Sequence, residues 1–511
     1  MYANGRKNKA IINLIYAWLN QVVIILLNFA IRIIFIKVLS KNYLGINGLF
    51  SNIINMLSLA ELGIGSAIVF SLYEPLAEKN NELIESIMQF YKKVYHVIGL
   101  VIAVLGFSCM PFLQFFIKEM PDIPQLRLIY ILFVLNTAVS YFFSYKSSLI
   151  SADQKDYLVK KIRLICYIVM YVVQAIILLL TKNYILFLMV QLITTLIQNM
   201  LYSNKADALY PFIKKHKTRQ LPAEVLSQIL LNTKSLMFHK IGSAMVFSTD
   251  NMIISKYVGL EGVALYSNYT LISQTLDNIL VQIFLAMSAS VGNLGVLESN
   301  EKKLEIFNHV FFINFWIYSF CSITFYCLAQ NFIQLCFGRD FLLGNFTLLI
   351  IVINFYLTGL RRSVLTFKEA FGLFYQNRFM PLGEAVINLI ASLVLVKFIG
   401  ISGVFLGTLI SSILMPIVIE PWVLFKYGFK KNIIIYWKTY FKFNLLTVLF
   451  GIITIVLCEK ILLESIFLTL LVKGLLCFFV INIGYILLFF KNIEFLYIKS
   501  FLLEMRKNNV R

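Results

Sequence analysis

Charged side chains are scarce in this sequence of 511 residues. They make up 14% of it, whereas residues of the AVILMFWYC set make up 60%, and the mean hydropathy is +0.82. Soluble globular proteins are closer to half apolar and a quarter charged. A soluble enzyme is therefore excluded, and the chain is predicted to be an integral membrane protein.

Cysteine and histidine are also few, and they are dispersed. The seven cysteines lie in separate apolar runs without a Cys-X-X-Cys pair, and the four histidines are far apart in the sequence. This spacing indicates neither a disulfide framework nor a metal site, so no metal cofactor is expected. No GxxxxGK[ST] motif occurs, which excludes ATP hydrolysis at a P-loop, and no catalytic residues are expected.

Acidic residues are outnumbered, with 25 Asp+Glu against 45 Lys+Arg and a net charge of +20. In a soluble protein this excess would indicate nucleic acid, but in a membrane protein it is typical of cytoplasmic loops that face anionic lipid. No nucleic-acid partner is therefore expected. Most of the basic residues fall on the side of the membrane that holds both termini, so both termini are predicted to be cytoplasmic.

Apolar runs bounded by charged residues or by proline and glycine predict an all-α fold of about fourteen transmembrane helices. The predicted spans cover residues 11–38, 43–71, 90–117, 126–150, 162–181, 184–203, 233–257, 263–292, 308–336, 345–367, 380–398, 402–425, 441–459 and 464–490.

Similarity within the sequence recurs at a nearly constant offset of about 217–220 residues across six successive spans. Lys37 aligns with Lys256, and Phe112-Leu113-Gln114 aligns with Phe332-Ile333-Gln334. Six spans form an even number, so the two copies are predicted to have the same orientation, as in transporters built from parallel repeats. The predicted domains are a six-helix lobe at 1–204, a cytoplasmic linker at 205–232, a second six-helix lobe at 233–425, and helices 13 and 14 with a cytoplasmic tail at 426–511.

Several cations fall inside the predicted spans, where a charge costs about 2.5–3.5 kcal/mol and usually faces protein or water. They are Arg32, Lys37, Lys256, Arg361 and Arg362. Guanidinium and ammonium groups from both repeats suit a phosphate, so these residues predict a central cavity that binds a phosphorylated substrate. Alternatively, Lys37 and Lys256 lie near the ends of their spans and extend to the lipid headgroups.

Acidic and amide residues also occur within spans. Glu61 and Asp277 are expected to face the cavity or to pair with its cations. Oxygen ligands for a coupling ion, either Na+ or a proton, are predicted at Asp250, Glu384, Asn388 and Thr408. Alternatively, these side chains form hydrogen bonds that tie the spans together.

Glycine and proline within the spans predict local packing features. Close helix approach is expected at Gly63, Gly65, Gly403 and Gly407, and kinks are expected at Pro111 and Pro416.

Two segments resemble a known family. They read RIIFIKVLSKNYLGINGLFSNIINMLSLAELGIGSAIVFSLYEPLAE (Arg32 to Glu78) and STDNMIISKYVGLEGVALYSNYTLI (Ser248 to Ile272). Essentially the whole chain resembles the polysaccharide-exporter branch of the multidrug/oligosaccharidyl-lipid/polysaccharide (MOP) superfamily. This branch contains Wzx-type flippases of bacterial O-antigen, capsule and exopolysaccharide synthesis, and lipid II flippases of the MurJ type are more distant relatives.

The resemblance implies two lobes around a V-shaped cavity and an alternating-access cycle in the bacterial cytoplasmic membrane. The implied substrate is an undecaprenyl-pyrophosphate-linked oligosaccharide that moves from the inner to the outer leaflet. The implied partners are the lipid bilayer, a polysaccharide polymerase and other assembly proteins. Helices 13 and 14 would hold the polyprenyl tail, or alternatively form a peripheral pair that only stabilises the bundle.

The resemblance also suggests roles for individual residues. Arg32 loosely matches the first-span arginine of lipid II flippases. Asp250, Glu384, Asn388 and Thr408 fall where those proteins have a sodium site, although Glu384 and Asn388 occur in the reverse order. The resemblance therefore leaves the identity of the coupling ion open.

Three other functions are compatible with a polytopic membrane protein. One is a lipid II flippase. A second is a MATE-like exporter of small cationic molecules, which the arginines within the spans disfavour. A third is a membrane polysaccharide polymerase or ligase, but such an enzyme needs an external catalytic loop, and the predicted outer connections are short. The chain is therefore not expected to be an enzyme.

The assignment of Asp250 to a coupling-ion site is testable. The substitution Asp250→Asn removes a charge but keeps the side-chain size, so it should abolish any dependence of export on Na+ or pH. Export measured across a series of Na+ concentrations and pH values checks this expectation. An unchanged ion dependence would exclude Asp250 from the coupling site.

Overall fold

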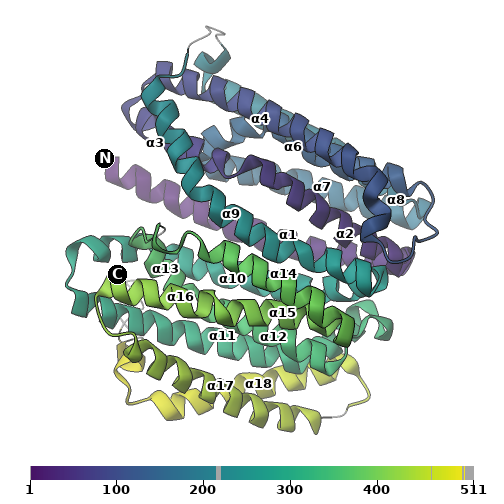
Figure 1. The fold of residues 1–511 in the computed structure, drawn as a ribbon, viewed down its shortest axis with the longest axis vertical. Coiled ribbons are helices and arrows are strands. Elements are labelled where there is room, and N and C mark those ends of the chain that lie inside the picture. Colours follow the sequence, from purple (N-terminus) through teal and green to yellow (C-terminus); the bar gives the residue numbers. More distant parts are fainter. Residues whose placement is uncertain (1, 215–219, 374, 462, 498–499, 501–511) are drawn as a thin grey trace. The chain divides into compact units, whose positions relative to one another are not determined.

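The computed structural model describes the backbone of residues 2–214, 220–373, 375–461, 463–497 and 500. It describes the side chains of these ranges except at residues 2–15, 17, 214, 235–236, 238–240, 242–247, 285–290 and 292–297. The described chain contains helices and connecting segments and no strand. It divides into two compact units, Met1–Ala264 and Leu265–Arg511, each of which is described by itself (Figure 1).

The described residues of the first unit form nine α-helices and the start of a tenth. They are α1 (Tyr2–Val38), α2 (Lys41–Leu57), α3 (Ile64–Glu78), α4 (Asn81–Cys109), α5 (Leu113–Phe116), α6 (Leu126–Ala152), α7 (Asp156–Thr181), α8 (Tyr184–Leu209), α9 (Ala223–Tyr257) and the start of α10 (Leu260–Leu297). Short 3₁₀ turns lie at Ser58–Glu61, Met110–Phe112 and Pro211–Lys214.

In the second unit, the part of the chain that the structure describes forms most of α10 and eight further α-helices. They are α11 (Asn300–Phe337), α12 (Asn345–Leu360), α13 (Arg362–Ala370), α14 (Met380–Ile399), α15 (Ile401–Leu414), α16 (Pro416–Val423), α17 (Ile434–Glu459) and α18 (Ile466–Phe489). Short turns lie at Arg339–Phe341 and Tyr375–Asn377, and a π-helical segment at Leu424–Phe429.

The predicted all-α membrane fold is confirmed. In the described part of the chain, eleven helices are long and apolar enough to cross a membrane, or twelve if the bent pair at 41–61 and 64–78 is one span. Two further predicted spans correspond to α9 and α10, whose side chains are described only in part, so the number fourteen remains a prediction.

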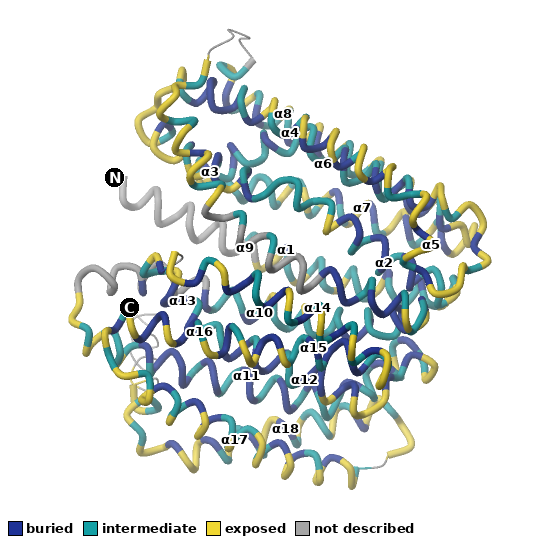
Figure 2. Tube along the Cα trace, viewed as in Figure 1, coloured by how far each residue is buried: buried dark blue, intermediate teal, exposed yellow. Residues whose placement is uncertain are grey.

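Apolar side chains are exposed along several of these helices. On α17 and α18 they include Leu445, Leu449, Ile452, Leu468, Leu471 and Leu475, and Figure 2 shows exposed residues recurring along both helices. An exposed apolar surface of this length is unusual in a soluble monomer, but it is the surface that lipid tails contact.

The repeat seen in the sequence recurs in the helix boundaries. Helix α2 starts at Lys41 and α10 at Leu260. The same interval separates the starts of α4 and α11 and the starts of α6 and α12, and it falls within the range of offsets given by the sequence similarity. Helix starts are determined by capping and turn residues, so this agreement extends the repeat beyond apolar similarity.

The boundary between the compact units follows α9. This helix contacts α2, α3 and α5 of the first unit, and a Cβ at Gly45 of α2 would overlap Leu260 just after α9. The repeat, in contrast, places the lobe boundary in the linker at 205–232. The lobes defined by the repeat therefore remain a prediction about the transport cycle, whereas the packing groups α9 with the first unit.

The predicted second span, 43–71, is broken. Its two segments, Lys41–Glu61 and Ile64–Glu78, are bent by 48° at Leu62 and Gly63, which have φ angles of 47° and 81°. Glycine adopts positive φ without the penalty that a Cβ imposes, so Gly63 permits the bend. Gly65 allows close packing, as predicted, because a Cβ there would overlap the Tyr95 hydroxyl.

Both prolines expected to kink their spans lie at helix breaks. Pro111 follows the end of α4 at Cys109, and Pro416 begins α16 after Met415, whose φ and ψ of −112° and −81° are not helical. Proline lacks an N–H and clashes with the preceding turn, which explains both breaks.

Helices α14 and α15 pack antiparallel along a polar seam. Ser412 Oγ donates to Glu384 Oε1 at 3.5 Å, and Asn388 Nδ2 donates to Thr408 Oγ1 at 2.9 Å. One turn further along α14, Ser392 Oγ donates to the carbonyl oxygen of Val404 at 3.1 Å. Contacts that recur every four residues on both helices fix the helix register.

Glycines bring these two helices together. A Cβ at Gly403 would lie 2.6 Å from the backbone nitrogen of Val396, and one at Gly407 would lie 2.6 Å from that of Ser392. The close approach expected at both positions is therefore confirmed.

The seam generates a stability prediction. Gly407→Ala should lower the thermal stability of the protein in detergent by about 1–3 kcal/mol, because the methyl group meets backbone that moves only with the helix. Gly474→Ala in α18 is the matched control, since its nearest neighbour beyond its own helix is a Leu328 side-chain carbon 3.8 Å away. Equal melting temperatures for the two variants would contradict the tight seam.

Candidate functional site

Arg32 lies in a polar cluster of the first unit. It is half-buried on α1, and its guanidinium interacts electrostatically with Tyr184 at the start of α8. Asn47 of α2 donates its Nδ2 to the Tyr184 hydroxyl at 3.0 Å. The cluster therefore joins α1, α2 and α8 around one cation.

The two repeat-related lysines lie in the last turns of their helices. Lys37 is exposed at the end of α1. Lys256 lies in the last turn of α9, with its ammonium nitrogen 5.0 Å from the centre of the Phe115 ring. These positions are those expected if the lysines extend toward lipid headgroups, and the structure does not test their proposed role in diphosphate binding.

Arg361 belongs to a buried ionic network in the second unit. Its Nε donates to Glu420 Oε2 at 3.0 Å, and its Nη2 donates to Glu420 Oε1 at 3.2 Å. Lys368 Nζ donates to the same Oε1 at 3.0 Å, and Arg361 Nη1 lies 3.9 Å from Glu384 Oε1. Two cations and two carboxylates neutralise one another, which makes their burial tolerable.

The position of Arg361 depends on a break between α12 and α13. Asn314 of α11 donates its Nδ2 to the carbonyl oxygens of Gly359 and Leu360 at 3.2 and 2.8 Å and to Ser363 Oγ at 3.3 Å. The ring of Tyr318 occupies the space where a Cβ of Gly359 would lie. One asparagine therefore satisfies the backbone groups that the break exposes.

Arg362 is paired with a different acid. Its Nη2 donates to Asp277 Oδ2 at 2.6 Å, and the Tyr318 hydroxyl donates to Asp277 Oδ1 at 3.0 Å. This ion pair is one of the two arrangements that the sequence left open for Asp277. Arg361 and Arg362 are thus both engaged with carboxylates, and a substrate phosphate would have to displace one of them.

Of the four residues predicted to bind a coupling ion, three lie together on the α14–α15 seam. Asn388 and Thr408 bond to each other, and Glu384 accepts from Ser412 and faces Arg361. This is the hydrogen-bonded alternative weighed from the sequence. Asp250 is buried on α9 of the other unit, and an ion site shared by all four residues stays a prediction.

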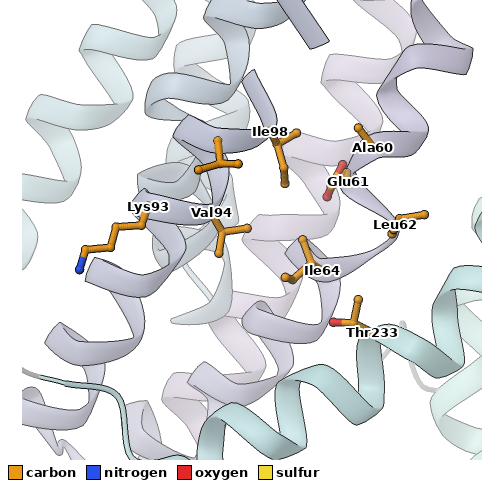
Figure 3. A pocket seen from close by; sticks show the side chains of 9 residues that line it. Ala60, Glu61, Leu62, Ile64, Lys93, Val94, Ile98 and Thr233 are labelled. Carbon is orange, nitrogen blue, oxygen red and sulfur yellow. The ribbon is translucent and has the colours of Figure 1, made fainter. Parts of the chain in front are cut away.

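Glu61 lines a small cavity in the first unit with a volume of about 310 Å³ (Figure 3). Tyr95 and Tyr141 donate hydroxyl protons to its carboxylate at 2.9 and 3.4 Å. Lys93 lines the same cavity, but its ammonium group points away from Glu61 (Figure 3). In the described part of the chain Glu61 has no cationic partner, and tyrosine hydroxyls hold it instead.

A larger and more polar pocket of about 480 Å³ lies among α6, α7 and α8. Its lining is mostly hydroxyl and amide side chains, with Arg163 as the charged member: Asn136, Thr137, Ser140, Ser144, Ser147, Val159, Arg163, Tyr167, Met170, Tyr171, Gln191, Thr194, Thr195, Gln198, Asn199 and Tyr202. No carboxylate is among these lining residues.

Internal hydrogen bonds organise this pocket, referred to below as the polar pocket. Thr195 Oγ1 donates to Asn136 Oδ1 at 2.7 Å, and the Tyr171 hydroxyl donates to Asn28 Oδ1 of α1 at 2.5 Å. The Arg163 guanidinium carbon lies 5.8 Å from the centre of the Tyr167 ring. Among the described residues, no carboxylate is within 4.0 Å of Arg163, so its charge is available to a ligand.

Sequence reasoning missed both the polar pocket and Glu420. The pocket had a signal, because Ser140, Ser144 and Ser147 recur at helical spacing within one predicted span, as do Gln191, Thr195 and Gln198 in another. Glu420 is an acid within the predicted span 402–425, where any charge indicates a partner. That this partner is the Arg361 and Lys368 pair emerges only from the packing of α13 against α16.

Comparison with solved structures identifies the fold. The lipid II flippase MurJ in an inward closed conformation aligns with a TM-score of 0.65 at 14% sequence identity, covering 94% of this chain and 99% of that chain. An inward-facing multidrug resistance MATE family transporter of the MOP superfamily aligns with a TM-score of 0.61 at 14% identity, covering 80% and 94%.

A MOP superfamily transporter from Pyrococcus furiosus, reported to have a binding pocket of reverse polarity, aligns with a TM-score of 0.57 at 14% identity, covering 84% of this chain and 97% of that chain. No protein-family model and no curated protein matches the sequence. The chain therefore has the fold of the MOP superfamily, a multi-pass membrane fold.

The ionic network makes a prediction about stability. Glu420→Gln leaves the charges of Arg361 and Lys368 buried without their shared carboxylate, so it should destabilise the protein by about 3–5 kcal/mol. This loss of stability is measured by thermal unfolding in detergent, with the remaining folded protein quantified by size-exclusion chromatography.

The exposed Glu464, which precedes α18, supplies the control for that measurement. Glu464→Gln should leave the melting temperature nearly unchanged. If Glu420→Gln were as stable as Glu464→Gln, the network would not be needed for the packing of α13 against α16.

Proposed function

We propose that this protein is a flippase that moves an undecaprenyl-pyrophosphate-linked oligosaccharide from the inner to the outer leaflet by alternating access. The oligosaccharide is a repeat unit of O-antigen, capsule or exopolysaccharide. The membrane is the bacterial cytoplasmic membrane with both termini on its inner side, and a polysaccharide polymerase acts on the product.

The observation that carries this proposal is the character of the polar pocket. Hydroxyl and amide groups form directional hydrogen bonds with sugar hydroxyls, and tyrosine rings offer flat surfaces on which sugars pack. The charged lining residue is Arg163, a guanidinium that can bind a phosphate or an acidic sugar through two parallel hydrogen bonds. A pocket for cationic drugs would instead need an acid in its lining, so a neutral or anionic hydroxylated ligand fits better.

The share of this chain that each solved structure covers adds support for the flippase proposal. The lipid II flippase covers 94% of this chain, whereas the other two structures cover 80% and 84%. The difference is similar to the length of the segment that holds α17 and α18. A proposed role for these two helices, with their exposed apolar surfaces, is to accompany the polyprenyl tail along the membrane.

Arg32 is the first candidate among the predicted cations for binding the diphosphate. It is half-buried and lies more than one turn before the end of α1, whereas Lys37 and Lys256 lie in the last turns of their helices. Arg361 and Arg362 would join it only in a conformation in which Glu420 or Asp277 is displaced. Asp250, Glu384, Asn388 and Thr408 remain proposed ligands for Na+ or a proton that drives the cycle.

Mass spectrometry of polyprenyl-linked intermediates tests the proposal directly. Cells that lack the protein should accumulate one completed oligosaccharide-diphosphate lipid, and a leaflet-specific probe should find it on the inner leaflet. Accumulation of that lipid on the outer leaflet would place the protein after translocation, and an unchanged lipid profile would contradict the flippase proposal.

The polar pocket is tested by Arg163→Ala. Loss of the guanidinium should reduce export at least tenfold, because a charge-assisted hydrogen bond to a phosphate or carboxylate contributes about 1.5–3 kcal/mol. The control is Lys161→Ala, which removes an exposed cation two residues away that does not line the pocket. Export in complemented cells, normalised to membrane protein level, is the measurement, and equal export by both variants would exclude Arg163.

A lipid II flippase is the second candidate, favoured by the extent of the match to MurJ. Its substrate is also a polyprenyl diphosphate, so the same intermediates distinguish the two. Accumulation of the peptidoglycan precursor in place of a polysaccharide repeat unit would assign this function.

A further inference from the structure

Three of the seven cysteines converge in the second unit, although they are distant in the sequence. Cys327 lies on α11, Cys458 in the last turn of α17 and Cys477 on α18. Their sulfur atoms all lie within 4.8 Å of one another, and those of Cys458 and Cys477 are 3.8 Å apart. Cys458 and Cys477 are buried, with 3% and 0% of their surfaces exposed.

The packing of α11 against α18 holds this cysteine triad in place. Ser319 lies eight residues before Cys327, and Tyr485 lies eight residues after Cys477. Their hydroxyl groups form a hydrogen bond, with 2.5 Å between the oxygens. Asn331 lies four residues after Cys327, and Lys473 lies four residues before Cys477. Lys473 Nζ donates a hydrogen bond to Asn331 Oδ1 at 3.3 Å. These contacts on both sides fix an antiparallel register in which Cys327 and Cys477 face each other.

We propose that the cysteine triad binds one thiophilic d¹⁰ cation, Cu(I). Metal–sulfur bonds of about 2.3 Å arranged in a trigonal plane separate the sulfur atoms by about 4.0 Å. This separation is close to the 3.8 Å between Cys458 and Cys477 and is within the 4.8 Å that bounds all three sulfur–sulfur distances. Thiolates select Cu(I) and Zn²⁺ over harder cations. Structural zinc sites almost always have four ligands, so three thiolates favour Cu(I).

The surroundings complete the site. Three thiolates and Cu(I) carry a net negative charge, and Lys473 lies one helical turn from Cys477 and interacts electrostatically with Cys458. A cation on the triad links α11 to both α17 and α18, which are the helices outside the repeat. Metal binding therefore stabilises the docking of the two C-terminal helices.

The test uses the full chain purified in detergent under reducing conditions. Cu(I) is supplied from a chelator that competes for it, the excess is removed by gel filtration, and bound copper is measured by mass spectrometry. The expected result is about one Cu per chain and a rise of several degrees in melting temperature on loading.

Matched variants locate the copper. Cys327→Ser is compared with Cys321→Ser on the same helix, and Cys477→Ser with Cys166→Ser, another buried cysteine. The triad variants should lose at least nine-tenths of the bound copper and the thermal shift, whereas the controls keep both. Size-exclusion profiles before loading establish that each variant is folded.

Three outcomes would overturn the proposal. One is no copper retained by the wild-type chain, and a second is equal copper in the triad variants and their controls. The third is a Cys458–Cys477 disulfide, detected by peptide mass mapping of protein alkylated in the membrane, because a disulfide leaves the site without its thiolates.

Discussion

The constraint on which this structure depends is the absence of water from the lipid interior. Backbone N–H and C=O groups must bond within the protein there, and a helix satisfies them within its own segment. Where a helix breaks, its backbone groups need another hydrogen-bond partner or a change of backbone conformation. Asn314 bonds to the carbonyl oxygens exposed between α12 and α13, and at Leu62 and Gly63 the chain bends through positive φ angles. Breaks in the spans are therefore tied to specific residues.

The same constraint governs the charges. In the second unit Arg361, Lys368 and Glu384 gather around Glu420, and Arg362 pairs with Asp277, so each of these charges has an opposite within reach. These pairs hold α10, α13, α14 and α16 together. In the first unit Arg163 lines a pocket of hydroxyl and amide groups. The polar side chains of the spans are therefore of two kinds: some bond to other helices, and others remain available to a ligand.

Much of the fold could be predicted because apolar length and helical periodicity are local properties. The predicted span 126–150 became α6 at Leu126–Ala152, and the span 184–203 became α8 at Tyr184–Leu209. Helix ends were predicted too short where charged side chains continue the helix beyond its apolar part, as in α4, which starts at Asn81 rather than at residue 90. The sequence identified Arg361 and Arg362 as significant, but their partners were not predictable, because Glu420 and Asp277 are 59 and 85 residues away.

The sequence by itself determined a polytopic helical membrane protein, because the number of apolar residues and their spacing are sufficient for that conclusion. It also predicted an internal repeat of six spans. Only the tertiary structure decided which side chains meet. Cysteines without a ligand-like spacing converge where α11, α17 and α18 pack, and polar stripes of three helices close around one pocket. The physical reason is that contacts between helices depend on the rotation and register of each helix, and many local choices of rotation satisfy the same apolar pattern.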